Sequence, residues 1–174
     1  AYGTQIGISF DTLLFRDKPR EDPEIDETPL RNELPRGYVQ RVAREKASAL
    51  AHTTPGAVLC ADTSVVAGRR ILGKPADEAE ARQMLARLSG RWHSVFTGVS
   101  LVQGERHLTF SCETRVRFFD LTAAEIDAYI ATGECMDKAG AYGIQGRAGL
   151  FVRRLEGSYS GVMGLPLFET GELL

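Results

Sequence analysis

The stretch Val58-Leu59-Cys60-Ala61-Asp62-Thr63-Ser64-Val65-Val66 decides the fold class. It is a short apolar run with β-branched residues at both ends, bounded by turn-forming Pro and Gly, and this pattern is typical of a buried strand in an α/β sheet. A carboxylate there is costly to bury unless it is paired or holds a cation. We therefore expect Asp62 and Thr63 to lie where the strand ends and opens to solvent, where open α/β sheets bind ligands. The alternative is that Asp62 caps a turn.

The composition bounds the class of protein. The 174 residues, 43% hydrophobic and 25% charged, suit one globular domain or two small lobes. A net charge of −2 and a pI near 6.0 give no electrostatic case for binding nucleic acid or an anionic membrane. No apolar run approaches the roughly 20 residues of a membrane span, and no secretory segment opens the chain. We therefore expect a cytoplasmic protein without nucleic-acid or membrane partners, and the sequence leaves a homodimer open.

The cysteines and histidines argue against disulfides and zinc. The number of cysteines, three, is odd, and they lie far apart in the sequence, at Cys60, Cys112 and Cys135. This indicates reduced thiols in the cytoplasm. His52, His93 and His107 form no pair at a metal-binding spacing. Any metal would therefore be a hard cation held by carboxylates.

One lysine lies on the wrong side of a predicted helix. Residues 37–51 form an amphipathic pattern whose apolar stripe consists of Val39, Val42, Ala43, Ala47 and Leu50. Lys46 falls in the middle of that stripe. Such a lysine either extends its ammonium outward to solvent or is held to bind an anion, and both alternatives stay open.

An acidic turn and a second lysine are further candidates. Prolines through residues 16–35 predict a loop without regular structure, and Glu24-Ile25-Asp26-Glu27 within it is either functional or a plain solvated turn. The stretch Gly68 to Pro75 resembles a phosphate-binding G-x-x-x-x-G-K loop. It is rejected as one, because Pro75 replaces the hydroxyl residue that would bind magnesium. Lys74 remains a candidate phosphate contact beside the end of the sheet.

The rest of the chain continues the α/β pattern. The expected elements are a weak strand within 1–15, helices over 77–89 and from 122 to about 132, an antiparallel pair of strands over 95–102 and 108–118, a strand over 150–155, a turn over 157–161 and a C-terminal helix from 165. Thr122 at the N-cap and Glu125 three residues later predict a capping box at the start of the helix from 122. The stretch 137–146 holds three glycines, which permit close backbone approach to a ligand or to another chain segment. There are no internal repeats and no domain linker.

Several motifs together resemble one family. They are Ala61-Asp62-Thr63, Gly73-Lys74-Pro75, Ser89-Gly90, Asp137-Lys138-Ala139-Gly140-Ala141-Tyr142-Gly143-Ile144-Gln145-Gly146 and Val162-Met163-Gly164-Leu165-Pro166. In this order, over nearly the whole chain, they resemble the Maf family of nucleoside triphosphate pyrophosphatases, also known as septum-formation inhibitors. The decapeptide around Tyr142 is the most specific signal.

The resemblance implies roles for particular residues. Asp62 would be the catalytic acid/base or a metal-activating carboxylate, and Glu27 a second acid at the metal, with these two roles exchangeable. Lys46 and Lys74 would hold phosphates. Thr63 and Gln145 would belong to the base-selecting pocket. The implied cofactor is a divalent cation, Mg²⁺ or Mn²⁺.

The implied fold is α/β, with a mixed, elongated, twisted sheet, flanking helices and two lobes around a central cleft, in one domain over 1–174. The family normally begins with a strand and a Ser-x-Ser-Pro-Arg-Arg loop, which this sequence lacks, and we expect those residues to exist beyond the sequence given. A longer segment over 17–23 is a second departure.

The implied activity is hydrolysis of dTTP and UTP between the α- and β-phosphates, giving the monophosphate and pyrophosphate. The resemblance also implies clearing of nucleotides and a link to arrest of cell division. One alternative is the branch that acts on 7-methyl-GTP, whose glycine-rich stretch differs from the one here. Another is a nucleotide-binding regulator of septum formation without turnover. Asp62, Glu27, Lys46 and Lys74 together favour an enzyme.

Overall fold

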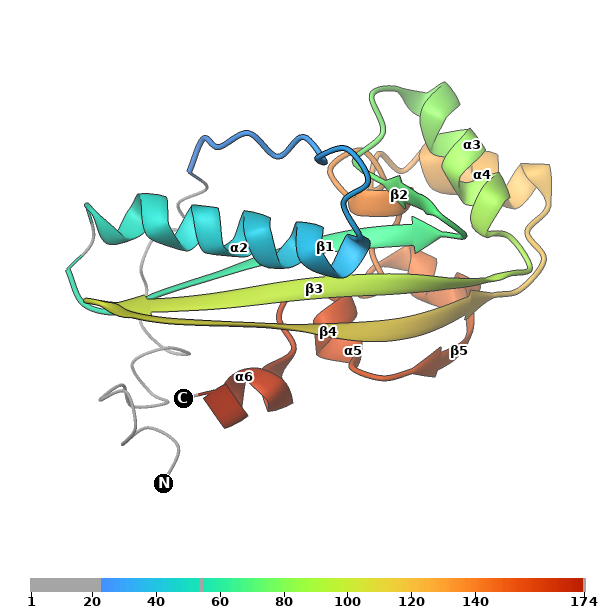
Figure 1. Ribbon diagram of the computed structural model, residues 1–174. Coiled ribbons are helices and arrows are strands. Elements are labelled where there is room, and N and C mark those ends of the chain that lie inside the picture. Colours follow the sequence, from blue (N-terminus) through green and yellow to red (C-terminus); the bar gives the residue numbers. More distant parts are fainter. Residues whose placement is uncertain (1–22, 54, 174) are drawn as a thin grey trace. The chain divides into compact units, whose positions relative to one another are not determined.

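The computed structural model describes residues 23–53 and 55–173 (Figure 1). Its helices are α2 (Pro35–Ala51), α3 (Glu78–Leu88), α4 (Ala123–Ile130), α5 (Tyr159–Val162) and α6 (Leu167–Leu173). Its strands are β1 (Val58–Ala67), β2 (Arg70–Leu72), β3 (Trp92–Gln103), β4 (Arg106–Phe118) and β5 (Val152–Glu156), and short 3₁₀ segments are η2 (Ala139–Ala141) and η3 (Arg147–Phe151). The strand predicted within 1–15, and all but the last residue of the 17–23 segment, lie outside the described residues.

The strands form one sheet in the order β2-β1-β3-β4-β5. β1 pairs with β2, and β4 with β5, in antiparallel fashion, and a tight turn at Gly104-Glu105 joins β3 to β4. The fold combines this sheet with helices, so the predicted α/β class is confirmed. The chain divides into two compact units, which are described separately below. The first holds the described residues up to Asp62, Thr97–Cys112 and the chain from Leu165; the second holds Thr63–Phe96 and Glu113–Gly164.

Helix α2 dominates the first unit. It begins at Pro35, two residues earlier than predicted, because proline suits the first helical position, where its missing N–H would have no partner in any case. The predicted apolar stripe is buried except at Leu50, which is partly buried, and Lys46 lies inside the stripe. The helix lies directly on β3. The backbone of Val39 in α2 occupies the space that a side chain at Gly98 of β3 would need.

The contact at Gly98 gives a stability prediction. A Cβ there would collide with the carbonyl of Val39, and backbone cannot move aside as a flexible side chain can. We expect Gly98→Ala to lower the free energy of unfolding by about 1–3 kcal/mol, the usual cost of overpacking a core. Denaturant unfolding followed by circular dichroism measures this. Gly37→Ala is the control. Gly37 lies in α2, the helix that contains Val39, and the space around its Cβ position is open. A Gly98→Ala protein as stable as wild type would contradict the prediction.

Helices α3 and α4 of the second unit each begin directly after a residue whose side chain caps them. Asp77 accepts a hydrogen bond from the N–H of Glu80 at the start of α3. Thr122 and Glu125 form the predicted capping box at the start of α4. The two helices pack against each other. Their apolar faces meet a core that includes Val65, Leu85, Leu88, Val95, Phe118, Ile126 and Phe151.

A buried histidine completes this core. The ring of His93 contacts Phe118 and Tyr142 edge to face, and its Nε2 lies 2.8 Å from the Tyr142 hydroxyl. Burial lowers the pKa of His93 to about 4, so the imidazole is neutral at physiological pH. Within residues 23–53 and 55–173, no three His, Cys, Asp or Glu side chains gather as a metal site would require.

One local prediction is wrong. Residues 157–161 were expected to form a turn, but Ser158 instead caps the short helix α5, its hydroxyl accepting a hydrogen bond from the N–H of Gly161. Serine and glycine favour both turns and helix caps, so composition alone does not separate the two.

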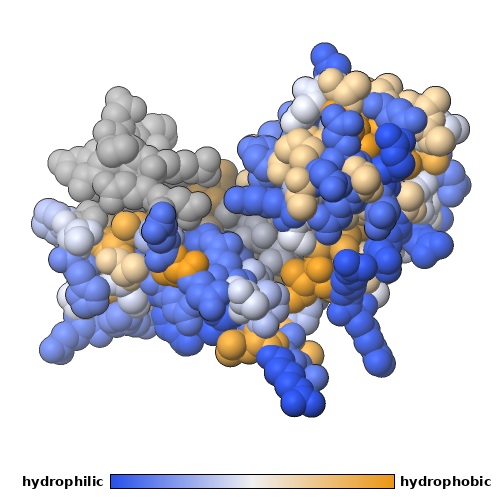
Figure 2. Space-filling view, turned by 90° about the horizontal axis from the view of Figure 1, so that it is seen from above, coloured by the Kyte–Doolittle hydropathy of each residue, from blue (hydrophilic) through white to orange (hydrophobic). Residues whose placement is uncertain are grey.

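At the surface, hydrophilic side chains cover most of the face seen from above, with apolar ones in small separate patches (Figure 2). Among the described helices, none has the length and apolar character needed to span a bilayer.

Candidate active site

Asp62 lies inside a strand rather than at its end. β1 continues to Ala67, and its far half pairs with β2 through Val65 and Leu72. The expectation of a strand end is therefore wrong, as is the alternative of a turn cap. The physical reason is the charge partner: the Asp62 side chain is only 10% exposed, and its Oδ1 lies 3.3 Å from the ammonium of Lys46. A paired carboxylate does not need to reach solvent.

Lys46 projects from the buried face of α2 into a pair of carboxylates. Its Nζ lies 2.6 Å from Oε1 of Glu27 and 3.3 Å from Oδ1 of Asp62, and its side chain is 11% exposed. The ammonium therefore does not extend outward to solvent, which was one of the two alternatives. One buried cation thus stands between two acids that come from separate parts of the sequence.

The acidic segment is tied to α2 by its backbone. The hydroxyl of Tyr38 donates to the carbonyl of Glu27 at 2.9 Å, and Arg41 donates to the carbonyl of Thr28 at 3.1 Å. Arg41 also forms an ion pair of 2.8 Å with Glu33. Burial, with the nearby charges of Asp62 and Glu27, raises the pKa of Tyr38 to about 12, so its hydroxyl stays a proton donor.

The two neighbouring acids of this segment do different things. Asp26 turns back on the chain, where its Oδ1 accepts from the N–H of Thr28, and hydrogen bonds from Thr28 lower the pKa of Asp26. Glu27 instead reaches Lys46. The plain solvated turn therefore describes Asp26, while Glu27 belongs to the charged cluster.

The cluster of Lys46, Glu27 and Asp62 is suited to a magnesium-like cation. Mg²⁺ is commonly held in proteins by one or two carboxylates together with substrate phosphates and water. The carboxylates of Glu27 and Asp62 match the protein part of that donor set. A cage built wholly from protein side chains is not found among the described residues. The donors therefore fit a cation that binds together with a phosphate-bearing substrate.

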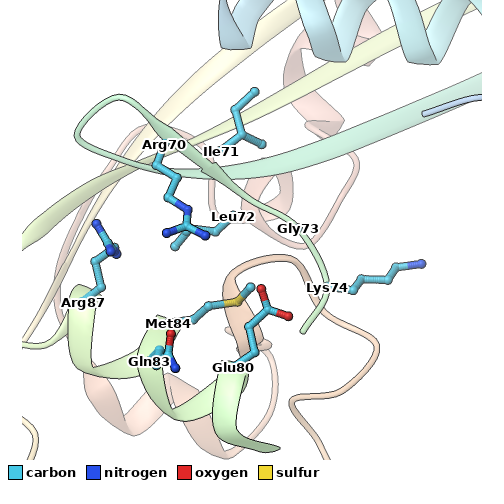
Figure 3. A pocket seen from close by; sticks show the side chains of 9 residues that line it. All are labelled: Arg70, Ile71, Leu72, Gly73, Lys74, Glu80, Gln83, Met84 and Arg87. Atoms are coloured by element: carbon cyan, nitrogen blue, oxygen red, sulfur yellow. The ribbon is translucent and has the colours of Figure 1, made fainter. Parts of the chain in front are cut away.

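Thr63 and Lys74 belong to the second unit. Thr63 is half-buried in β1, and the backbone at Gly164 lies beside it, with the Cβ position of Gly164 3.8 Å from Thr63 Oγ1. Lys74 is exposed just after β2 and borders a pocket of about 200 Å³ that Arg70, Glu80 and Arg87 also line. Its side chain extends away from theirs (Figure 3). The ammonium of Lys74 is thus directed outside this pocket.

Gln145 lies at the tip of a tight turn. The N–H of Gly146 donates to the carbonyl of Gly143 at 3.0 Å, which closes the turn and leaves Gln145 exposed. A Cβ on Gly143 would lie 3.4 Å from Cε of Lys138 and 3.6 Å from Oε1 of Gln145. The side chains of Lys138 and Gln145 therefore converge over a glycine. At Gly140, with φ of +69°, the backbone instead packs against Val65, so part of this stretch approaches another chain segment.

A family model described as Maf-like protein matches residues 5–174. The chain belongs to the Maf family. The predicted family resemblance is thereby confirmed.

Similar proteins occur in several organisms. A dTTP/UTP pyrophosphatase of Sphingopyxis alaskensis is 58% identical over 87% of this chain and 80% of its own length. Proteins of the same name from Dechloromonas aromatica and Shewanella oneidensis are 51% and 50% identical, each over 98% of this chain and over 88% and 89% of their own lengths.

In this Maf protein the structure joins three of the six predicted site residues directly. Glu27 and Asp62 each form an ion pair with Lys46 in the first unit. Thr63, Lys74 and Gln145 are placed in the second unit, and their binding roles stay predictions. Sequence reasoning missed Tyr38 as a support of the acidic segment. Its spacing of eight residues from Lys46, about two helical turns, could have indicated the shared face.

Proposed function

We propose that this protein is a nucleoside triphosphate pyrophosphatase that hydrolyses dTTP and UTP to the monophosphate and pyrophosphate. The observation that carries the proposal is the buried ammonium of Lys46 between two carboxylates, in a chain about half identical to proteins named dTTP/UTP pyrophosphatase. A triphosphate is highly anionic, so a site for it needs cations. Lys46, Lys74 and a divalent metal ion supply them.

The proposed chemistry needs a base, a charge partner and a positioned water. Asp62 takes the proton from the water that attacks the phosphoanhydride between the α- and β-phosphates. Glu27 and Asp62 would hold the divalent cation, which when bound would offset charge on the phosphate oxygens. Lys46 lets the two carboxylates share a small space without repulsion, and it offers a cation to the substrate phosphates. Pyrophosphate leaves as the second product.

Selection of the nucleobase of the substrate is assigned to Gln145. Its amide offers one donor and one acceptor, which together match the O4 and N3–H edge of thymine or uracil. Cytosine presents an amino donor and a bare acceptor there. Because an amide can flip, Gln145 excludes cytosine only if its surroundings fix its orientation. The exposed position at a turn tip leaves its amide available to a ligand.

We expect Gln145→Ala to reduce the preference for dTTP and UTP over CTP by about tenfold, because a mispaired polar group costs about 1–3 kcal/mol. Values of kcat/KM across the triphosphates, with dTTP and UTP similar to each other in wild type, provide the measurement. Gln83→Ala, an exposed glutamine on α3 in the same unit, is the matched control. CTP or GTP as the best wild-type substrate would contradict this role, and so would an unchanged ranking in Gln145→Ala.

A single assay separates the proposal from its alternatives. Release of pyrophosphate, converted to phosphate by a coupled inorganic pyrophosphatase, is followed for dTTP, UTP, CTP, the purine triphosphates and 7-methyl-GTP. We expect dTTP and UTP to be turned over fastest. Preference for 7-methyl-GTP would indicate the other branch of the family, and binding without turnover of any triphosphate would indicate a regulator.

A further inference from the structure

The turn that carries Gln145 is held at both of its ends by side chains from outside it. The N–H of Gly143, which is buried, donates to the hydroxyl of Tyr129 at 3.3 Å. At the other end the N–H of Arg147 donates to Oε2 of Glu134 at 3.1 Å. Gln145 lies midway between these two attachment points.

The two attachments are themselves connected. The hydroxyl of Tyr129 donates to Oε1 of Glu134 at 3.1 Å, so a continuous chain of three hydrogen bonds runs from Gly143 to Arg147. Burial raises the pKa of Tyr129, which keeps its proton available for Glu134. Each carboxylate oxygen of Glu134 thus accepts one bond, and the Tyr129 oxygen both donates and accepts.

The glycine beside Gln145 makes room for this arrangement. Any side chain at Gly146 would collide with the carboxylate of Glu134, so the carboxylate lies directly over the backbone of the turn. Tyr129 is fixed by burial in the core, 3% exposed, and by edge-to-face contact with the ring of Phe151. The Gly143 end of the turn is therefore anchored to the core of the second unit, and the Arg147 end to the partly buried carboxylate of Glu134.

We propose that Tyr129 and Glu134 are positioning residues that fix the Gln145 turn and thereby set selectivity for the pyrimidine base. This rests on the proposed function, because Gln145 must read the base. An amide that must tell uracil from cytosine needs one fixed orientation, and backbone bonds at positions 143 and 147 limit the movement of the turn. Loss of either anchor frees the turn while leaving the phosphate-binding cluster around Lys46 intact.

The test uses Tyr129→Phe, Glu134→Ala and Glu134→Gln in the full chain. We expect the ratio of kcat/KM for UTP over CTP to fall by about tenfold in the first two, the amount expected when a hydrogen bond that holds the turn is lost. The loss should come from faster CTP hydrolysis and a higher KM for UTP, with kcat for UTP nearly unchanged. Glu134→Gln should recover part of the ratio, since its amide oxygen can still accept from the N–H of Arg147.

Two further measurements distinguish positioning from a general structural effect. In a Gln145→Ala background, Glu134→Ala should leave the UTP/CTP ratio unchanged, because both substitutions act through one side chain. Amide hydrogen exchange over residues 143–147 should accelerate in Tyr129→Phe and Glu134→Ala, whether or not the protein is active. Tyr159→Phe, which changes a half-exposed tyrosine elsewhere in this unit, is the control.

The outcomes separate the inference from the proposed function. Equal loss of activity toward all triphosphates, or unchanged selectivity with an intact Gln145 effect, overturns the positioning role. Unchanged exchange over 143–147 overturns the anchor itself. If wild type hydrolyses no triphosphate, the proposed function fails and with it the link to selectivity, while the exchange experiment still decides the anchor.

Discussion

Asp62→Asn is expected to lower kcat for dTTP hydrolysis by about 10²–10⁴, the usual contribution of a general base. Asparagine keeps the shape of aspartate, and its Oδ1 can still accept from Lys46, which lies 3.3 Å away in the wild-type chain. The variant loses the charge and the proton acceptor but not the local packing. We therefore expect the fold and nucleotide binding to remain largely as in wild type. Single-turnover rates at saturating nucleotide, with a separate binding titration, measure the two effects independently.

Asp127→Asn serves as the matched control. Asp127 is half-exposed on α4 and forms a surface ion pair with Arg82, so removing its charge should change the rate by less than about threefold. Asp62→Asn activity within a few-fold of wild type would overturn the assignment of Asp62 as the base. Loss of the folded state in Asp62→Asn, seen by circular dichroism, would instead show that the pair with Lys46 is needed for stability.

Removal of divalent cations is the second large effect expected. With a chelator such as EDTA we expect hydrolysis to fall by at least about 10²-fold, because an in-line displacement at phosphate relies on metal charge. Added Mg²⁺ or Mn²⁺ should restore it, since both prefer oxygen ligands such as carboxylates and phosphates. Glu27→Gln should raise the metal concentration needed for half-maximal rate by about tenfold, as one charged ligand is lost.

The control for the metal experiment is Glu24→Gln. Glu24 lies in the same acidic segment but has no part in the cluster around Lys46 that is assigned to the metal, so its metal dependence should equal that of wild type. Full activity in EDTA would rule out a metal requirement. Restoration by Zn²⁺ alone would also contradict the prediction, because the donors offered here are carboxylate oxygens.

Local elements of this protein could be predicted well. The capping box at Thr122 and the apolar stripe of α2 follow from side chains within one or two helical turns of each other. For the same reason Lys46 could be recognised as misplaced before any partner was known. The family motifs likewise identified the Gln145 stretch, although not what holds it in place.

The site itself depended on contacts between distant segments. The sequence indicates three acids around Ile25 but not which of them faces Lys46, because that choice follows from the hydrogen bond of Tyr38 to the backbone of Glu27. The sequence likewise suggests, wrongly, that Asp62 needs a strand end. The pattern of a strand does not show that a helix supplies a cation, here Lys46, to pair with the carboxylate.

The sequence by itself thus determined the helices, the α/β class and the residue types available for phosphate chemistry, because these depend on neighbours along the chain. Only the tertiary structure decided that Asp62 can stay inside β1 and that Glu27, not Asp26, shares Lys46 with it. It also decided that Tyr129 and Glu134 anchor the Gln145 turn. Each of these depends on a charge or hydrogen-bond partner brought close by folding, and the energy of such a pair exists only once the two groups meet.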